Sequence, residues 1–213
     1  VQQVVRDFLT PIADEITTDS HGNVIACKNP DKERRILVDA HCDQIGLIIS
    51  HIDDQGFLYV QPIGGWDPQQ LVGQRVTIWA SETGVPGVIS RKPIHLQDES
   101  ERGQVAKLKE LWIDIGASSA DEASEMVRVG DSATLVLGYQ ELANRRISGP
   151  AMDDRTGLWV GLEAFRQAAK KQTECSLFMV SAVQEEVGLR GATTAAYGID
   201  PHIGIALEVT HAT

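Results

Sequence analysis

Residues 176–209, SLFMVSAVQEEVGLRGATTAAYGIDPHIGIALEV, give the strongest indication of the fold class of this chain. This stretch opens with an apolar run at 176–183 and closes with another at 203–209, and both indicate buried strands because apolar and polar residues do not alternate. Between them, residues 189–197 predict a helix. A strand, a helix and a strand in this order imply a right-handed crossover between parallel strands. The stretch therefore predicts an α/β domain built on a parallel sheet.

The sequence on the N-terminal side of this stretch extends the same domain. Apolar residues at helical spacing predict a helix at 156–171, and similar spacing predicts an amphipathic helix at 1–12. Residues 15–28 read as a hairpin with His-Gly-Asn at its turn. Two further apolar runs, 35–40 and 45–49, predict short strands covered on both faces.

The middle of the chain follows a different sequence pattern. Short apolar segments alternate with glycines and with Pro86-Gly87, which is typical of a small β-barrel or sandwich. Ser119 stands three residues before Glu122, a capping box that predicts a helix at 120–127. We therefore expect an α/β domain interrupted by an insertion, with these boundaries: α/β domain 1–56 and 147–213, inserted β domain 57–146.

Composition excludes several classes of protein. The 213 residues include 30 Asp and Glu against 19 Lys and Arg, and a net charge of −11 argues against nucleic acid as a partner. No apolar run is long enough for a membrane span, and the N-terminal residues do not show the pattern expected of a signal peptide. Three widely spaced cysteines form neither a disulfide framework nor a metal knuckle, so we expect a reducing compartment, the cytoplasm. Both ends look cut, and we expect the natural protein to be longer.

The first candidate site residues follow the run at 35–40. His41 closes this predicted strand, and Asp43 stands two residues further on. A histidine in this place can present one ring nitrogen to a metal while a nearby carboxylate accepts the other ring N–H. A buried, hydrogen-bonded core histidine would explain His41 equally well.

Three further segments place carboxylates where α/β sheets carry their sites. Asp153-Asp154 precedes a predicted helix; capping explains one aspartate, but two exceed what capping needs. Glu185-Glu186 ends a buried strand, and neighbouring extended residues point apart, so one can bind a metal while the other faces water. A solvated turn is the alternative for this pair. With Glu208, these residues complete a nitrogen and oxygen donor set suited to zinc, cobalt or manganese.

These residues, in this order, resemble the glutamyl/tetrahedral aminopeptidase family of co-catalytic zinc/cobalt metallopeptidases, some of whose members are labelled endoglucanase M. The resemblance runs along nearly the whole chain and includes three motifs of the middle region: Gly64-Gly65-Trp66-Asp67-Pro68, Lys92-Pro93-Ile94-His95-Leu96 and Leu111-Trp112-Ile113-Asp114-Ile115-Gly116. It implies a phosphorylase/hydrolase-like metallopeptidase domain with an inserted small β-barrel domain that mediates oligomerisation.

The resemblance also implies roles for the site residues. Two divalent ions per subunit, zinc or cobalt with manganese as a further candidate, would be held by four ligands: His41, Asp153, Glu186 and Glu208. Asp153 would bridge both ions, with Asp154 as a supporting neighbour. Glu185 would be the catalytic general base and Asp43 the partner that orients His41. The family's remaining ligand, a second histidine, would lie beyond Thr213.

The function that follows from the resemblance is removal of N-terminal residues from peptide substrates by a water activated between two metals. The resemblance further implies homo-oligomers, with dimers as building blocks of dodecamers. A glycosidase with paired carboxylates is an alternative, but adjacent Glu185 and Glu186 diverge and the alternative leaves His41 unexplained. Chelation would separate these two readings. A catalytically incomplete fragment or assembly module is the non-enzyme alternative, which an intact mass would test.

Overall fold

The computed structural model describes residues 1–211, and the chain divides into two compact units. One unit combines Val1–Gln44 with the chain from Tyr139 onward, and the other is Ile45–Gly138. The first unit is therefore interrupted by the second, as the sequence predicts, although the boundaries differ.

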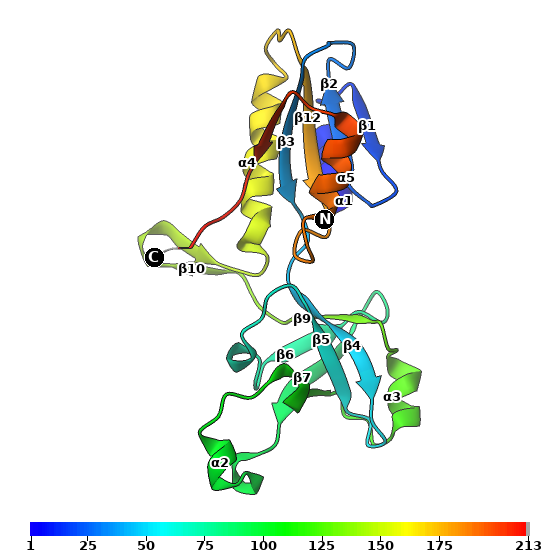
Figure 1. Ribbon diagram of the computed structural model, residues 1–213, viewed down its shortest axis with the longest axis vertical. Helices are drawn as coiled ribbons and strands as arrows, with labels where there is room; N and C mark the ends of the chain where they lie inside the picture. The colour runs from blue at the N-terminus through cyan, green and yellow to red at the C-terminus, as the bar shows by residue number, and fades with distance from the viewer. Residues whose placement is uncertain (212–213) are drawn as a thin grey trace. The chain divides into compact units, whose positions relative to one another are not determined.

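A five-stranded mixed sheet forms the centre of the first unit (Figure 1). Its order is β1-β2-β12-β3-β13, in which β3 lies between β12 and β13 and is parallel to both. The hairpin predicted at 15–28 adds an antiparallel edge, because β2 pairs antiparallel with β1 and with β12. The strand bounds are β1 Glu15–Thr18, β2 Val24–Lys28, β3 Arg35–His41, β12 Ser176–Ala182 and β13 Ile203–Ala206.

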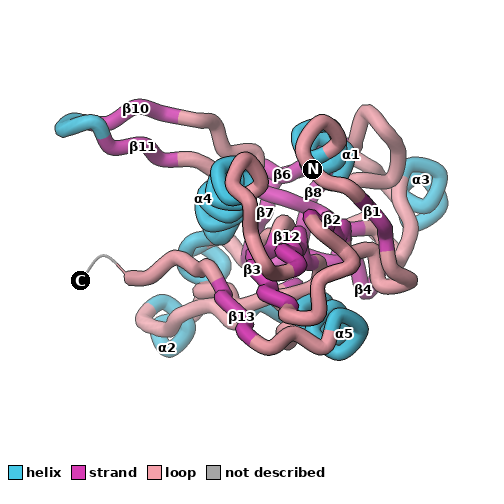
Figure 2. Tube along the Cα trace, turned by 90° about the horizontal axis from the view of Figure 1, so that it is seen from above, coloured by secondary structure: helices cyan, strands magenta, loops and turns pink. Residues whose placement is uncertain are grey.

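Helices cover both faces of this sheet (Figure 2). Helices α1 (Gln2–Leu9) and α4 (Met152–Ala168) pack on one face, where Leu9 and Met179 are fully buried. Helix α5 (Arg190–Ile199) packs on the other face against Leu37 and Val180. Burial of each such side chain stabilises the fold by about 1.5–3 kcal/mol, so these two clusters hold the strand ends in place.

Two features of this unit differ from the prediction. Strand β13 ends at Ala206 rather than 209 and is exposed throughout, because among the described residues it is an edge strand paired with β3 alone. A hairpin of β10 (Gln140–Leu142) and β11 (Arg146–Ser148), joined by η4 (Ala143–Arg145), was not predicted. All its strand residues are exposed, so its sequence carries no apolar alternation to read.

The second unit is a closed barrel in the order β4-β5-β8-β7-β6-β9, with antiparallel neighbours throughout. Its core is fully buried and includes Leu58, Ile78 and Ile113. Helix α3 (Ala120–Met126) begins at its predicted cap, where the Ser119 hydroxyl accepts the Glu122 N–H. The strand bounds are β4 Gly46–Ile52, β5 Leu58–Ile63, β6 Arg75–Ile78, β7 Val85–Arg91, β8 Leu111–Asp114 and β9 Ser132–Leu135. The remaining helices are short: η1 Pro68–Gln70, η2 Ile94–Leu96, α2 Glu99–Arg102 and η3 Leu108–Glu110.

The barrel unit starts and ends earlier than the predicted insertion, 57–146. Strand β4 was assigned to the α/β domain, but Leu47 and Ile49 point into the barrel core, while Ser50 and His51 are exposed. The adjacent isoleucines of this strand conceal the alternation that marks a barrel strand. At the other end, residues 139–146 leave the barrel and contribute to the β10–β11 hairpin. Among the described residues, no helix combines the length and apolar character needed to cross a bilayer.

Candidate metal centre

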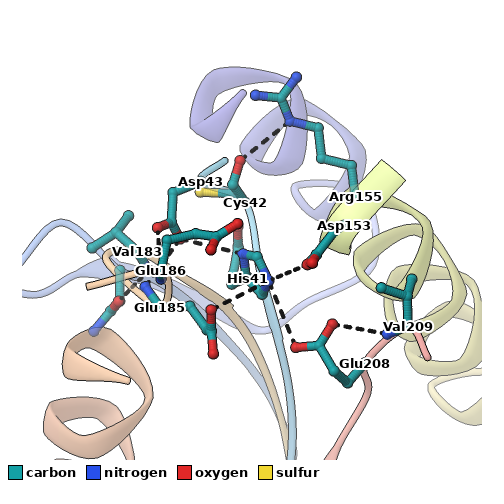
Figure 3. A network of polar contacts seen from close by, with 12 residues as sticks. His41, Cys42, Asp43, Asp153, Arg155, Val183, Glu185, Glu186, Glu208 and Val209 are labelled. Atoms are coloured by element: carbon teal, nitrogen blue, oxygen red, sulfur yellow. Dashed lines mark hydrogen bonds and ion pairs between the residues drawn. The ribbon is translucent and has the colours of Figure 1, made fainter. Parts of the chain in front are cut away.

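The candidate site lies at the carboxyl ends of the three parallel strands of the first unit (Figure 3). His41 is the last residue of β3, and Glu185 and Glu186 follow the end of β12. Glu208 stands two residues after β13, and Asp153 lies in the first turn of α4. Because neighbouring parallel strands end at one edge of a sheet, residues remote in sequence meet there.

His41 is the centre of this arrangement. Its ring is 2% exposed, and its Nε2 lies 2.9 Å from Asp153 Oδ1, 3.6 Å from Glu208 Oε2 and 3.7 Å from Glu185 Oε2. Its Nδ1 faces Asp43 Oδ1 at 3.4 Å. One imidazole is therefore surrounded by four carboxylates that come from four separate segments of the chain.

The possible ligand atoms form two groups that share His41. In one group the donor atoms of His41, Asp153 and Glu208 all lie within 4.8 Å of one another, and in the other those of His41, Glu185 and Glu186 do. Whereas the histidine is buried, the side chains of Asp153 and Glu208 are 58% and 47% exposed. The six residues predicted for the site thus lie close together, with Asp153 and Glu208 towards solvent and Asp43 and Glu185 largely covered.

The site holds more negatively charged groups than positively charged ones. Burial raises the pKa of Glu185 and of Glu186 above the ordinary glutamate value, and nearby carboxylates raise both further. Burial alone would lower the pKa of His41, but Asp43, Glu185 and Glu208 together raise it to about 9. These shifts have one cause in common, an excess of negative charge around His41 that favours the addition of positive charge.

The donor set fits a divalent cation. The Nδ1 atom of His41 is buried and makes no hydrogen bond in the described structure, although Asp43 Oδ1 lies 3.4 Å away, whereas Nε2 lies 2.9 Å from Asp153 Oδ1. Converging carboxylates repel one another unless a cation lies between them. Imidazole nitrogen and carboxylate oxygen are ligands that zinc, cobalt and manganese accept.

Backbone contacts hold the ligand segments against each other. The carboxylate of Asp43 accepts the N–H groups of Glu185 and Glu186 at 3.2 and 3.3 Å. These bonds, and the contact with His41, hold the pKa of Asp43 below its usual value although burial opposes them. The Nε of Arg155 donates to the carbonyl of Cys42 at 3.2 Å and so ties the start of α4 to the end of β3. Arg155 was not predicted to take part in the site, because a bond to a distant carbonyl has no sequence signature.

Asp154 is the most deeply buried acid of the site. It is fully buried, and burial, with Glu208 as a further cause, raises its pKa to about 6. Its Oδ1 accepts the N–H of Gly157 at 3.0 Å. A Cβ on Gly157 would lie only 2.3–2.7 Å from the Asp154 carboxyl atoms, so glycine alone fits beside it. Asp154 supports the start of α4 next to Asp153.

Parallel strands that end in a shared cluster of one histidine and several carboxylates define an α/β protein with a site of the metal-binding type. The sequence profile of the M42 glutamyl aminopeptidase family matches residues 22–213. The chain belongs to this family.

Two aminopeptidases are similar to this chain along its whole length. The lysyl aminopeptidase of Pyrococcus furiosus is 38% identical over 214 residues, a match that covers 100% of this chain and 61% of the relative. A TET aminopeptidase from the marine sediment archaeon Thaumarchaeota archaeon SCGC AB-539-E09 has a TM-score of 0.94 at 36% identity and is likewise covered to 61%, with all of this chain aligned. The chain therefore spans about three fifths of the length of these proteins.

A third similar protein is described together with its assembly. The TET1 peptidase of Pyrococcus horikoshii is said to assemble into a tetrahedron or a large octahedral shell. It aligns with a TM-score of 0.87 at 33% identity, over 98% of this chain and 62% of its own length. The mixed sheet and the closed barrel are thus the fold of TET aminopeptidases.

Proposed function

We propose that the protein is a metal-dependent aminopeptidase that removes N-terminal residues from peptides. The observation that carries this proposal is the convergence of the donor atoms of His41, Asp153, Glu186 and Glu208, within 4.8 Å in two groups that share the histidine. Membership of the M42 family supports the same activity.

Two divalent ions, zinc or cobalt with manganese as a third candidate, would be held by His41, Asp153, Glu186 and Glu208, with Asp153 shared between them. When bound, they would supply positive charge that polarises a peptide carbonyl and makes a nearby water more acidic. Asp43 Oδ1 lies 3.4 Å from Nδ1 of His41, so with a metal bound its carboxylate would accept the Nδ1 proton and leave Nε2 to act as the ligand.

Glu185 is the proposed general base. Its carboxylate faces the cluster, where burial raises its pKa towards the range useful for proton transfer at neutral pH. It takes one proton from the attacking water as the new C–O bond forms, and returns it to the amine nitrogen as the C–N bond breaks. The glutamate therefore ends the cycle in its starting state.

The test of this role is Glu185→Gln in the whole protein. A general base contributes about 10²–10⁴-fold, so turnover of an aminoacyl-p-nitroanilide should fall by at least that factor while metal content stays near that of the parent. Glu174→Gln is the matched control, since Glu174 is an exposed glutamate whose partner is Lys32. Loss of metal together with activity would contradict the base assignment, and activity that survives chelation would contradict the metallopeptidase itself.

Assembly is a second part of the proposal. Similar proteins are described as a dodecamer and as tetrahedral or octahedral shells, so this protein is proposed to form homo-oligomers through its barrel unit. Light scattering of the whole protein should give a mass well above one subunit, and a monomer at micromolar concentration would contradict it. The three free cysteines support a reducing compartment such as the cytoplasm.

A further inference from the structure

The loop that carries Glu185 and Glu186 runs from Val183 to Gly191 and is called here the glutamate loop (residues 183–191). It is closed on itself by backbone bonds, since Gly191 N–H donates to Val183 O at 3.0 Å and Arg190 N–H donates to Gln184 O at 3.2 Å. The loop is therefore a compact unit with two adjoining ends, Val183 and Gly191.

The backbone of this loop is strained. Gln184 and Leu189 have φ values of 57° and 58°, in the left-handed region that side chains other than glycine, asparagine and aspartate rarely adopt. Such a conformation persists only where the surrounding structure enforces it. The two glutamates thus depend on contacts made by other parts of the chain.

One side chain from a distant segment bonds to both ends of the loop. Asn23, fully buried just before β2, accepts the Val183 N–H on its Oδ1 at 3.0 Å and donates from Nδ2 to the Gly191 carbonyl at 2.9 Å. The same Nδ2 also contacts Asp19 Oδ2 at 2.7 Å and Thr194 Oγ1 at 3.1 Å. Both polar atoms of the amide therefore make hydrogen bonds. The two loop residues that they contact are 160 and 168 positions away in the sequence.

The packing around this amide leaves no room for displacement. A Cβ on Gly191 would lie 2.4 Å from Asn23 Oδ1 and 2.2 Å from Val183 O, so a glycine is required for the amide to reach both ends. On the opposite side of the loop, Asp43 accepts the N–H groups of the two glutamates. The glutamate loop is therefore held by hydrogen bonds at two places. Asp43 binds its middle, beside the cluster, and Asn23 binds its two ends.

We propose that Asn23 is a positioning residue, which clamps the two ends of the glutamate loop and thereby fixes Glu185 and Glu186 relative to His41. The proposal rests on the proposed function, because it concerns residues assigned to metal binding and proton transfer. Asn23 touches neither the ligand atoms nor the substrate, and it acts through the backbone of Val183 and Gly191.

The probe is Co²⁺ alone, titrated into the metal-free protein and followed by its visible absorption bands, which report ligand geometry as well as affinity. Asn23→Ala should weaken binding by about tenfold or more and alter the intensity of the bands, within the 10–100-fold range found for residues that orient ligands. Glu186→Gln sets the scale for loss of a proposed ligand.

Asn29→Ala is the matched control. Asn29 follows the other end of β2, where its side chain donates to Thr173 Oγ1 and to the Cys175 carbonyl before β12 begins. Its removal breaks two comparable bonds between the same segments, but at the end of the sheet remote from the cluster. The Tm of the Asn29→Ala protein should fall, while its Co²⁺ affinity stays within twofold of the parent and its absorption bands keep the parent's intensity.

Asn23→Ser guards against a failure of the alanine variant to fold, because its hydroxyl adds no charge beside Asp19 and can still bond to one buried partner, while it is too short to reach both Val183 and Gly191. It should fold, weaken Co²⁺ binding and change the spectrum. If folded Asn23 variants bind Co²⁺ as the parent does, the clamp proposal is overturned while the metal centre stands. If both variants fail to fold, the clamp proposal is also overturned, because Asn23 then serves the general stability of the protein. A parent protein that binds no Co²⁺ overturns the proposed function and the clamp with it.

Discussion

Replacing Gly157 by alanine should destabilise the protein, although the change would ordinarily strengthen a helix. Gly157 lies inside α4, where alanine is favoured over glycine by about 0.5–1 kcal/mol. Here, however, the new methyl group would lie 2.3–2.7 Å from the carboxyl atoms of Asp154, which is fully buried. The carboxylate must move by roughly 1 Å to reach an ordinary contact distance.

That movement sets the size of the expected loss in the free energy of unfolding. It breaks the 3.0 Å bond from the Gly157 N–H to a charged acceptor, which costs about 1.5–3 kcal/mol, and it overpacks a buried site, which costs about 1–3 kcal/mol. After subtraction of the gain in helix propensity, the net loss is about 2–5 kcal/mol. A loss of about 3 kcal/mol lowers Tm by roughly 6–12 °C in a chain of this size.

The assay is thermal unfolding of metal-free Gly157→Ala followed by far-ultraviolet circular dichroism, because the longest helices belong to the α/β unit. Gly198→Ala in α5 is the control, since a Cβ there meets no atom within 4 Å and only helix propensity changes. Its Tm should stay level or rise by a few degrees. A Gly157→Ala protein as stable as the parent would show that the close packing of Gly157 on Asp154 does not govern the stability of this region.

Three further predictions concern metal, pH and thiols. Zn²⁺ at a hundred times its dissociation constant should stabilise the protein by about 2.7 kcal/mol, and a chelator should reverse the gain in Tm; an unchanged Tm would contradict the metal site. Burial, which outweighs the opposing charge of His41, raises the pKa of Asp39 from 3.8 to about 6. Its contribution to stability is therefore complete below pH 3.8 and lost as pH rises through 6, so metal-free Asp39→Asn should gain Tm at pH 7.5 and not at pH 3.5. Half-buried Cys175 should react with a maleimide before Cys27, whose pKa burial raises to about 12, and before buried Cys42, as peptide mass mapping would show.

The sequence predicted the α/β framework because its signals are strong and local. The apolar run before Glu185 and the run that ends at His41 lie side by side as parallel strands, so their polar ends meet. Asp153 reaches this edge from the first turn of α4, and the sequence places it just ahead of a predicted helix. The roles assigned to these residues stay predictions until metal and turnover are measured.

Other features leave no periodic mark in the sequence. The boundary of the barrel was placed too late because Ile48 and Ile49 stand together in β4 and hide its alternation. Strand β13 was predicted to be buried from composition alone, whereas burial depends on which elements lie beside a strand. The bonds of Asn23 and the fit of Gly157 against Asp154 depend on side chains and backbone groups that only the folded chain brings together.

The interruption of the α/β unit by the barrel has a consequence for the order of folding. His41 and Asp153 lie 2.9 Å apart but are separated by 112 residues, most of them in the barrel. The strands by which the chain enters and leaves the barrel, β4 and β9, pair directly with each other. Once the barrel has formed and Leu47 pairs with Ala133, the free loop that must close shrinks to about 26 residues, which saves roughly 1.3 kcal/mol of closure entropy. A nascent chain that completes its barrel first would therefore assemble the cluster about tenfold faster, and refolding of a barrel-destabilised variant would reveal the difference.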